Sequence, residues 1–287
     1  MARFVRFAAT ASLVFALLGV CPRAVPAVAS AAGEVRKTTR YTVAVIPSAP
    51  PEDISAAWLP FLERLSRATG WEFDLKAYDK MSEFERDIER GAADFLFASP
   101  TQITVAHAVQ GYVPLVRGSA RIAGVLFVRA DSPIRSIRDL DNKEIAFVGT
   151  KNVCSVFTRS ALKGHVHLTY KSLFAGSSSN VLKMVQLGKA DAGATLDVEL
   201  ERIKDASFFR PILKTDKMAP HPLAAHPRVP KQAQDAVRQA ILGWSDDPAA
   251  QQQLKAIRMA KPVSADYDRD YRELETMDVR SLSQWGE

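Results

Sequence analysis

The first part of the chain alternates between a short apolar run and a longer segment with helical periodicity. Tyr41 to Ile46 is rich in β-branched and aromatic residues, and it ends at a proline-rich turn that contains Ser48. Apolar side chains then recur at intervals of three and four residues from Ile54 to Leu65, and Gly70 follows. This pattern predicts a strand followed by an amphipathic helix that Gly70 terminates.

The same alternation continues through most of the sequence. Short apolar runs predict further strands at 73–77, 95–98, 122–128, 144–148, 167–170 and 190–194. Helical periodicity predicts helices at 81–91, 153–162, 181–187, 231–242 and 248–257. Strands that alternate with helices indicate an α/β fold with mainly parallel sheets. The polar tail from Asp266 is expected to dock weakly or to fray.

One phrase occurs twice, at 89–99 and at 186–195. In each copy a helix ends at a glycine (Gly91, Gly188), an aspartate follows (Asp94, Asp191), and a buried strand leads into a polar turn. The aspartates precede their strands and are interpreted as turn residues. Ligands of α/β sheets bind beyond the carboxyl ends of the strands. Two copies, one in each half of the chain, therefore predict two lobes that face each other across a cleft.

The predicted division places a leader at 1–31, a first lobe at 40–128 with 212–287, and a second lobe at 129–211. The chain crosses between lobes near Arg129 and Pro211 in this scheme. Motion about these two crossings opens and closes such a cleft.

The first residues have the composition of a secretory signal peptide. A positively charged start with Arg3 and Arg6 precedes an apolar run from Ala8 to Val20, and small residues around Ala29 suit a signal peptidase. A lipoprotein signal ending at Cys21 is the alternative. The sequence predicts export to the periplasm, and no later run has the ~20 apolar residues that span a membrane.

Charge and cysteine content argue against a nucleic acid partner and against a reactive thiol. Removing the leader's arginines takes the formal net charge from +6 to +3, and no basic run suits a nucleic acid backbone. Cys154 would be the one cysteine of the mature chain, so no internal disulfide is expected. We interpret Cys154 as a small packing residue, because no neighbouring base is evident from spacing.

Polar turns follow three of the predicted strands and open three helices: Ser99 to Thr101, Gly149 to Asn152, and Gly176 to Ser179. A helix start offers unpaired N–H groups and the positive end of the helix dipole, and both suit an oxyanion. Hydroxyl groups on the same turns add donors. Simple helix capping is the favoured explanation for any one of these turns alone. Three such turns at strand ends, divided between the lobes, bring the binding interpretation level with it.

A few other polar residues are candidates for ligand contact. Asp197 follows a strand, so it either accepts a hydrogen bond from a protonated ligand oxygen or caps the next helix. His221 lies between prolines near the second crossing, at the cleft edge or on an exposed loop. Lys151 and Arg121 offer positive charge, with solvated surface as the alternative. His165 and His167 form a His-x-His pair, but no further metal ligands accompany them.

The chain has no P-loop, dinucleotide-binding, nucleophile-elbow or zinc-protease motif. We therefore expect a binding protein without cofactor, metal or catalytic residues.

Four stretches resemble the periplasmic phosphate, phosphite and phosphonate substrate-binding proteins of ABC transporters. They are Tyr41 to Pro47, Gly91 to Pro100, Gly124 to Ile134, and Ser136 to Val148. The resemblance extends from about Tyr41 to Leu242 and implies the type II periplasmic-binding-protein fold, with two lobes and two hinge crossings. It also implies a small anionic ligand and a membrane-embedded permease as partner.

The cleft residues depart from the family pattern. Ala98-Ser99-Pro100 replaces an aromatic-Gly-Pro turn, and the segment Thr150 to Ser155 keeps part of a Ser/Thr-rich loop. Gly176-Ser177-Ser178 lacks a histidine of the family, and Pro220-His221-Pro222 replaces Pro-x-Asp-Pro. The predicted ligand-binding residues are Ser48, Ser99, Thr101, Thr150, Lys151, Asn152, Ser155, Ser177, Ser178, Asp197 and His221.

The resulting hypothesis is a monomeric, exported protein that captures a small oxyanion for an ABC importer, with phosphate, phosphite and phosphonates as the leading ligands. A periplasmic sensor that reports to a membrane partner is the alternative. An enzyme on the same fold, using Cys154 and His221, is a third hypothesis.

Overall fold

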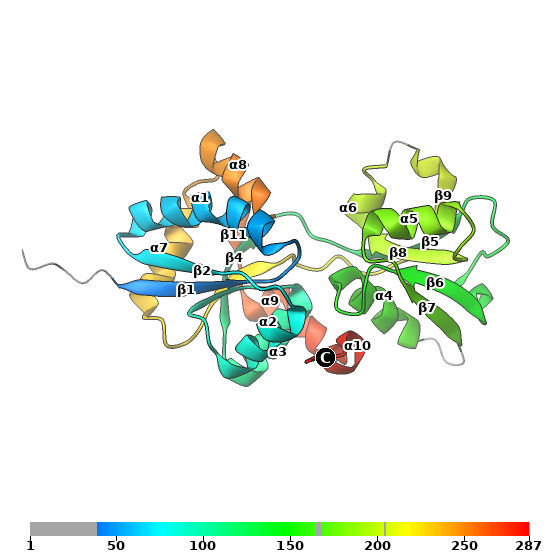
Figure 1. The fold of residues 1–287 in the computed structure, drawn as a ribbon, viewed down its shortest axis with the longest axis horizontal. Coiled ribbons are helices and arrows are strands. Elements are labelled where there is room, and N and C mark those ends of the chain that lie inside the picture. The colour runs from blue at the N-terminus through cyan, green and yellow to red at the C-terminus, as the bar shows by residue number, and fades with distance from the viewer. Residues whose placement is uncertain (1–38, 165–167, 204, 287) are drawn as a thin grey trace, which may run out of the picture. The chain divides into compact units, whose positions relative to one another are not determined.

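Two β-sheets organise the chain, and helices cover both faces of each (Figure 1). The computed structural model describes residues 39–164, 168–203 and 205–286. The predicted signal peptide at 1–31, Cys21, His165 and His167 lie outside these residues. Among the described residues, no helix combines the length and the apolar character needed to cross a bilayer.

The first sheet has the order β11-β4-β10-β3-β1-β2. Its strands are β1 (Arg40–Val45), β2 (Glu72–Lys76), β3 (Phe95–Phe97), β4 (Val113–Gly118), β10 (Pro222–Ala225) and β11 (Pro262–Ser264). β1 pairs in parallel with β2 and β3, whereas β10 is antiparallel to β3 and β4, and β11 to β4. The N-terminal strands therefore form the parallel part of a mixed sheet.

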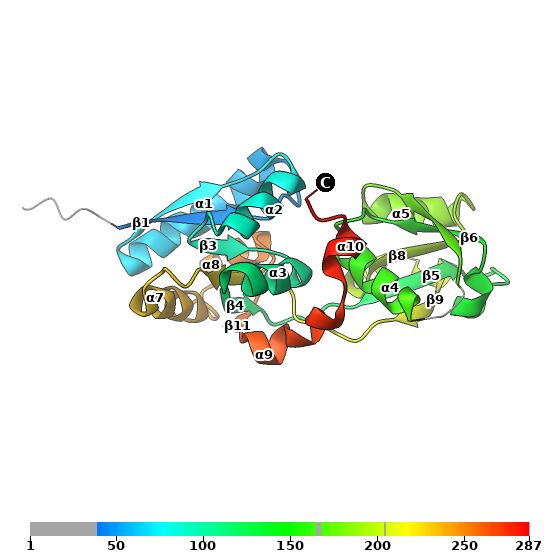
Figure 2. The same cartoon turned by 90° about the horizontal axis from the view of Figure 1, so that it is seen from below.

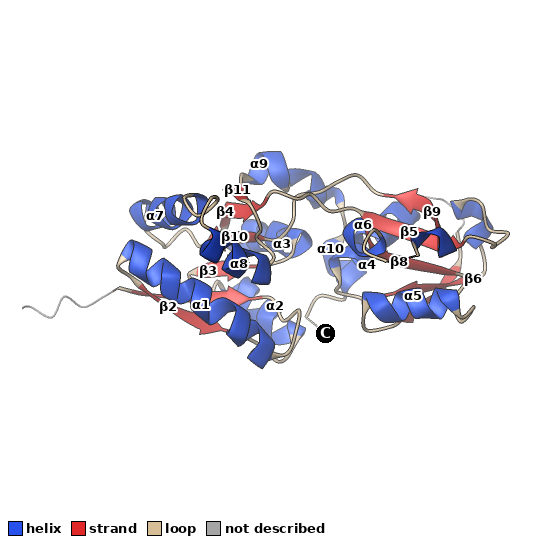
Figure 3. Ribbon diagram, turned by 90° about the horizontal axis from the view of Figure 1, so that it is seen from above, coloured by secondary structure: helices blue, strands red, loops and turns tan. Residues whose placement is uncertain are grey.

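Helices from both ends of the chain cover this first sheet (Figure 3). On one face, α1 (Pro51–Thr69) packs against α7 (Lys231–Leu242) and α8 (Pro248–Ala256). On the other face, α2 (Met81–Arg90) packs against α3 (Pro100–Gln110). The C-terminal part of the chain thus completes the lobe that the N-terminal part begins.

The second sheet has the order β7-β6-β8-β5-β9. Its strands are β5 (Gly124–Arg129), β6 (Lys143–Phe147), β7 (Tyr170–Phe174), β8 (Ala192–Leu196) and β9 (Phe209–Lys214). β6 is parallel to β7 and β8, and β5 is antiparallel to β8 and β9. The helical segments of this lobe are α4 (Val153–Lys163), α5 (Ser178–Gln186), α6 (Asp197–Leu200) and the short 3-10 helices Ile137–Leu140 and Ala206–Phe208.

The alternation of side chains along β5 builds a hydrophobic core on each face of this sheet. Leu126 packs in the cluster that contains Leu162 of α4, whereas Phe127 packs in the cluster with Val181 of α5. Gly193 of β8 allows the close approach of α5, because a Cβ there would lie 2.8 Å from Phe127 and Val181. Gly193, in the second copy of the repeated phrase, therefore serves helix packing.

The predicted two-lobe α/β architecture is confirmed, but both sheets are mixed and not mainly parallel. The strand pairing also places the boundaries between the lobes elsewhere than the predicted boundaries near residues 129 and 211. The segments 124–128 and 212–214, assigned by sequence to the first lobe, lie in β5 and β9 of the second sheet. The crossings between the sheets are therefore 119–123 and 215–221, and an Ile122–Met218 bridge joins them.

The repeated phrase has the same structure in both lobes. Gly91 and Gly188 follow their helices with positive φ values of 59° and 66°, which glycine adopts without strain. The Asp94 carboxylate accepts the Thr42 N–H at 2.9 Å, and the Asp191 carboxylate accepts the Glu144 N–H at 2.9 Å. Each aspartate thus fixes its turn to the start of the neighbouring parallel strand, as expected for a turn residue.

The expectation that the tail from Asp266 frays is wrong. This segment forms α9 (Tyr267–Asp270), the 3-10 helix Arg272–Thr276 and α10 (Val279–Ser283). Tyr271 and Leu274 are fully buried in the core of the first lobe. Figure 2 shows α10 between α3 and α4, and it contacts both helices. A few widely spaced apolar side chains therefore dock a segment that is mostly polar.

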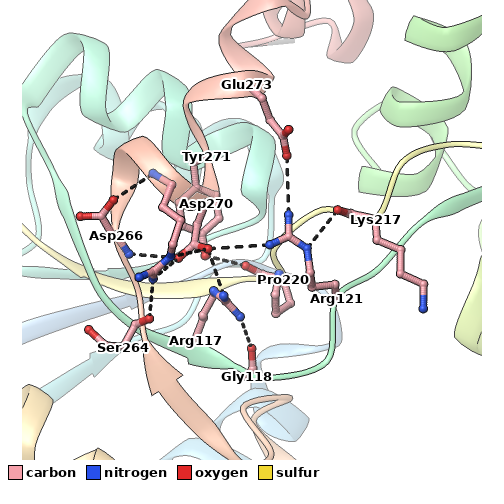
Figure 4. Close-up of polar contacts among 11 residues, drawn as sticks. Arg117, Gly118, Arg121, Lys217, Pro220, Ser264, Asp266, Asp270, Tyr271 and Glu273 are labelled. Carbon is pink, nitrogen blue, oxygen red and sulfur yellow. Dashed lines mark hydrogen bonds and ion pairs between the residues drawn. The ribbon is translucent and has the colours of Figure 1, made fainter.

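A buried carboxylate connects this tail to both crossings (Figure 4). Asp270 is fully buried, and its oxygens lie 3.0 Å from the Arg117 guanidinium and 2.7 Å from that of Arg269. Arg121 of the first crossing lies 3.9 Å from Asp270 and donates to the Lys217 carbonyl of the second crossing at 3.0 Å. Arg121, which the sequence offered as a source of positive charge or as solvated surface, belongs to this network.

The next residue adds a second link to the same place. The Tyr271 hydroxyl, also buried, donates to the Pro220 carbonyl at 2.9 Å. Burial alone would raise the pKa of Asp270, but hydrogen bonds from Arg269 and Arg117 outweigh it and hold the pKa well below the usual range. Asp270 is thus ionised and paired at the position where both crossings leave the first sheet.

We expect Asp270→Asn to lower the free energy of unfolding by about 3 kcal/mol, because it leaves buried arginine charge without its partner. Urea denaturation of the mature protein measures this value. Asp268→Asn is the matched control, since Asp268 is exposed and accepts from Arg272 at 2.9 Å on the surface. A change of about 0.5 kcal/mol or less is expected for this control. Equal effects of the two substitutions would contradict a special role for Asp270.

The depressed pKa of Asp270 also predicts a pH dependence. Its contribution to stability is complete above the unfolded-state pKa of about 4 and decreases as the pH falls toward the lower folded-state value. The stability difference between the wild type and Asp270→Asn should therefore shrink below about pH 4. Denaturation curves at several pH values test this, and a constant difference would contradict it.

Candidate functional site

A cavity of about 560 Å³ lies where loops from the two sheets meet. The loops after β1, β3, β6, β7 and β8 contribute to it, so it lies at the carboxyl ends of strands, as the repeated phrase predicted. The lining residues are Ile46, Pro47, Ser48, Met81, Ser99, Val148, Gly149, Thr150, Lys151, Asn152, Val153, Gly176, Ser177, Ser178, Leu196, Glu199, His221 and Arg258. The lining includes residues from all three predicted polar turns.

Each polar turn also caps the helix that follows it. The Ser99 hydroxyl accepts the Gln102 N–H at 3.2 Å, and the Ser99 N–H donates to the Gln102 side chain at 3.1 Å. The Asn152 side chain accepts the Cys154 N–H at 3.0 Å, and the Ser177 hydroxyl accepts the Asn180 N–H at 3.2 Å. Ser99, Asn152 and Ser177 therefore each cap a helix and line the cavity.

Three predicted ligand contacts lie outside the cavity lining. Thr101 is buried and pairs its hydroxyl with that of Ser99 at 3.1 Å. Ser155 is fully buried within α4. Asp197 is buried, accepts the Ala123 N–H at 3.1 Å and lies 3.2 Å from the Lys214 ammonium. Asp197 therefore holds the first crossing and the second sheet together.

The predicted cationic contact, Lys151, is already paired with a carboxylate. Its ammonium lies 2.6 Å from Glu85 of α2, and the Glu85 side chain is 1% exposed. Lys151 also donates to the Gln284 carbonyl at 2.8 Å, and the Gly286 N–H donates to Glu85 at 2.8 Å. A loop of the second lobe, a helix of the first lobe and the C-terminal segment therefore meet at this ion pair.

Sequence reasoning missed two charged residues of the cavity wall, Glu199 and Arg258. Glu199 lies on α6 and accepts the Thr195 hydroxyl at 2.6 Å. Arg258 follows α8, about 80 residues or more away in the sequence from each of the polar turns. Glu199 was within reach of the sequence argument, because it lies two positions after Asp197, which the sequence had already singled out. Nothing local to Arg258 indicated that it belongs here.

His221 is half-buried and lies in the cavity wall, with its ring stacked on Phe97 at a centroid separation of 5.7 Å. Burial, with a smaller effect from the nearby Arg258 charge, lowers the pKa of His221 to about 3. The imidazole is therefore neutral near pH 7 and offers hydrogen bonding but no charge.

Cys154 has the packing role expected from the sequence. It is buried, with its sulfur 3.8 Å from the Ala194 carbonyl. Burial, and then the Glu199 charge, raise the pKa of the thiol to about 12. The nucleophilic thiolate is therefore disfavoured. Within residues 39–164, 168–203 and 205–286, no group of three or more His, Cys, Asp or Glu side chains is arranged to hold a metal ion.

We expect Lys151→Gln to lower the free energy of unfolding by about 3 kcal/mol, because Glu85 would stay buried without its counter-charge. The double variant Glu85→Gln/Lys151→Gln removes both charges and should recover most of this loss. Urea denaturation of the wild type, the two single variants Lys151→Gln and Glu85→Gln, and the double variant gives the coupling energy between the two side chains. Additive effects of the single substitutions would show that the ion pair does not stabilise the fold.

Solved structures share this architecture. XAC2383 from Xanthomonas citri, solved with chloride bound, is 19% identical with a TM-score of 0.71, and the match covers 85% of this chain and 99% of that one. PhnD1 from Prochlorococcus marinus, solved with methylphosphonate, is 14% identical with a TM-score of 0.69, covering 85% and 99%. A binding protein component of an ABC phosphonate transporter from Pseudomonas aeruginosa is 14% identical with a TM-score of 0.60, covering 83% and 86%. At these identities the likeness concerns the fold.

A search of curated proteins by sequence found no match. The family model of the ABC transporter phosphonate periplasmic substrate-binding proteins matches residues 43–271, which is most of the chain. This range includes nearly all of both sheets and every residue of the cavity wall. The chain therefore belongs to the family of periplasmic substrate-binding proteins of phosphonate ABC transporters.

Proposed function

We propose that the protein is an exported, monomeric solute-binding protein that captures a small oxyanion in the cavity and presents it to the permease of an ABC importer. Ligands with a phosphate, phosphite or phosphonate group are the class favoured by family membership. The methylphosphonate bound to the Prochlorococcus protein supports the same class. Export rests on the signal-peptide composition of 1–31.

The observation that carries this proposal is the convergence of hydroxyl-bearing turns from both lobes on one cavity. Ser48 and Ser99 come from the first lobe, and Thr150, Ser177 and Ser178 come from the second. The helices α3, α4 and α5 begin at these turns, so the positive ends of their dipoles face the same space. N–H and O–H donors of this kind bind an oxyanion without a formal counter-charge.

Ligand capture by both lobes requires motion about the crossings 119–123 and 215–221. A ligand that contacts both lobes binds the closed form more tightly than the open form. It shifts the equilibrium between the two forms by that difference in affinity. The turns are therefore proposed to act as two halves of one site.

We expect isothermal titration of the mature protein with methylphosphonate, phosphite and phosphate to give measurable binding for at least one of them. Ser178→Ala should weaken that binding about tenfold, because it removes one hydroxyl donor from the cavity wall. Ser179→Ala is the matched control, since Ser179 is exposed and does not line the cavity. Absence of heat and of a thermal shift with all three anions would contradict the proposal.

A role in binding and not in catalysis predicts the behaviour of Cys154. Cys154→Ser should leave the affinity for the oxyanion within about twofold of the wild type, because the thiol is buried, protonated and not part of the cavity wall. The native thiol should react with a disulfide reagent only after unfolding in urea. A Cys154→Ser variant that abolished a measurable turnover would instead support the enzyme hypothesis.

A further inference from the structure

A second cavity, of about 500 Å³, adjoins the one at the polar turns. The two cavities share Leu196, Glu199, His221 and Arg258 in their walls, so they are direct neighbours. The second cavity extends over both crossings, at Ile122 and Pro220, toward α8 of the first lobe and α6 of the second. The combined space is of the size that holds an organic ligand and is larger than an inorganic oxyanion needs.

Positive charge is concentrated in this second cavity. Arg202 follows α6 of the second lobe, Lys255 lies on α8 of the first lobe, and Arg258 follows α8. Among the described residues, none of these three side chains pairs with a carboxylate, in contrast to Lys151, which Glu85 neutralises. The one acidic residue of this wall is Glu199. An anion that enters the second cavity therefore meets a net positive wall contributed by both lobes.

The backbone at Arg258 is unusual for an arginine. Its φ is 61°, and the Met259 N–H donates to the Leu254 carbonyl at 2.7 Å, which places Arg258 in the left-handed position just after helix α8. Glycine commonly occupies this position because a side chain there costs backbone energy. An arginine at this position is therefore unfavourable for the local backbone, and its side chain reaches the wall shared by both cavities.

Apolar side chains form another part of the wall of the second cavity. Ile122, Leu196, Val198 and Pro220 form this part of the wall. A ligand that occupies the whole space therefore needs a polar head at the turns, a short apolar connection, and a second polar group that suits guanidinium and ammonium donors. Guanidinium groups prefer planar, bidentate partners such as carboxylate or phosphoryl oxygens.

We infer that the ligand is an organic phosphonate or phosphate with a second anionic group, carboxylate or phosphoryl, which Arg258, Arg202 and Lys255 bind while the first phosphoryl group lies at the polar turns. This inference rests on the proposed function and specifies its substrate class. Because Arg258 and Arg202 belong to different lobes, the second anionic group also stabilises the closed form.

Matched ligand pairs test this inference by isothermal titration of the mature protein. 3-Phosphonopropionate and propylphosphonate have the same carbon number and differ in the carboxylate, and methylenediphosphonate and methylphosphonate differ in the second phosphoryl group. At least one bis-acid should bind tenfold or more tightly than its partner at low salt, and this advantage should decrease as ionic strength rises. The pair with the larger difference in affinity shows whether the second anionic group is a carboxylate or a phosphoryl group.

The variants Arg258→Gly and Arg202→Gln should each remove most of this advantage. Arg202 lies outside the cavity at the polar turns, so Arg202→Gln should also leave propylphosphonate and methylphosphonate binding within about twofold. Arg258→Gly is compatible with the positive φ, so its Tm should be unchanged or raised, and a loss of affinity cannot then be a loss of folding. Arg138→Gln is the control, because Arg138 is exposed and lies outside both cavities.

The outcomes separate this inference from the proposed function. Binding of simple phosphonates with no preference for either bis-acid would overturn the inference and leave the proposed function standing. A preference that survives both substitutions would also overturn it, because the second group would then lie elsewhere. Failure of every phosphonate and phosphate to bind would overturn both.

Discussion

The buried charge of Asp270 is the constraint on which the geometry of the cleft depends. A carboxylate with no exposed surface is stable only while its arginine partners stay in place. Those partners include Arg117 on β4 and Arg121 on the first crossing, and Arg121 in turn binds the Lys217 carbonyl of the second. The two crossings therefore leave the first sheet from a fixed position. This position determines where the hinge between the two lobes lies.

The C-terminal segment extends this constraint into the second lobe. Arg159 of α4 donates to the Leu282 carbonyl at 2.7 Å, and Lys151 binds both the Gln284 carbonyl and Glu85. The same segment is anchored in the first lobe by the buried Tyr271. The two lobes are thus linked by the two crossings, by the terminal segment and by the direct ion pair between Lys151 and Glu85. Opening of the cleft must either carry this segment with α4 or break the ion pair of Lys151.

Local features of the fold were predictable from sequence, whereas long-range pairings were not. Gly91 and Gly188 end their helices as expected because a left-handed cap depends on neighbouring residues alone. Which sheet β5 and β9 join depends on partners far away in the chain, so the predicted boundaries differed by about one strand. The polar tail was predicted wrongly for the same reason. Its composition is typical of a chain end that does not pack on the fold. The contacts that Asp270 and Tyr271 make with buried partners explain why it is folded.

The same distinction explains which site residues were found. Serine and asparagine at helix starts carry a local signal, and the structure brings those turns together. The role of a charged side chain has no such local signal, because it depends on which residues lie beside that side chain in the folded protein. Lys151 looked free and is paired, Asp197 looked available and is buried, and Arg258 looked unremarkable and lies in the wall of both cavities. The site therefore combines uncharged donors at the turns with cations around the crossings that pair with no carboxylate of the described residues. This division of charge favours a ligand with two different polar ends.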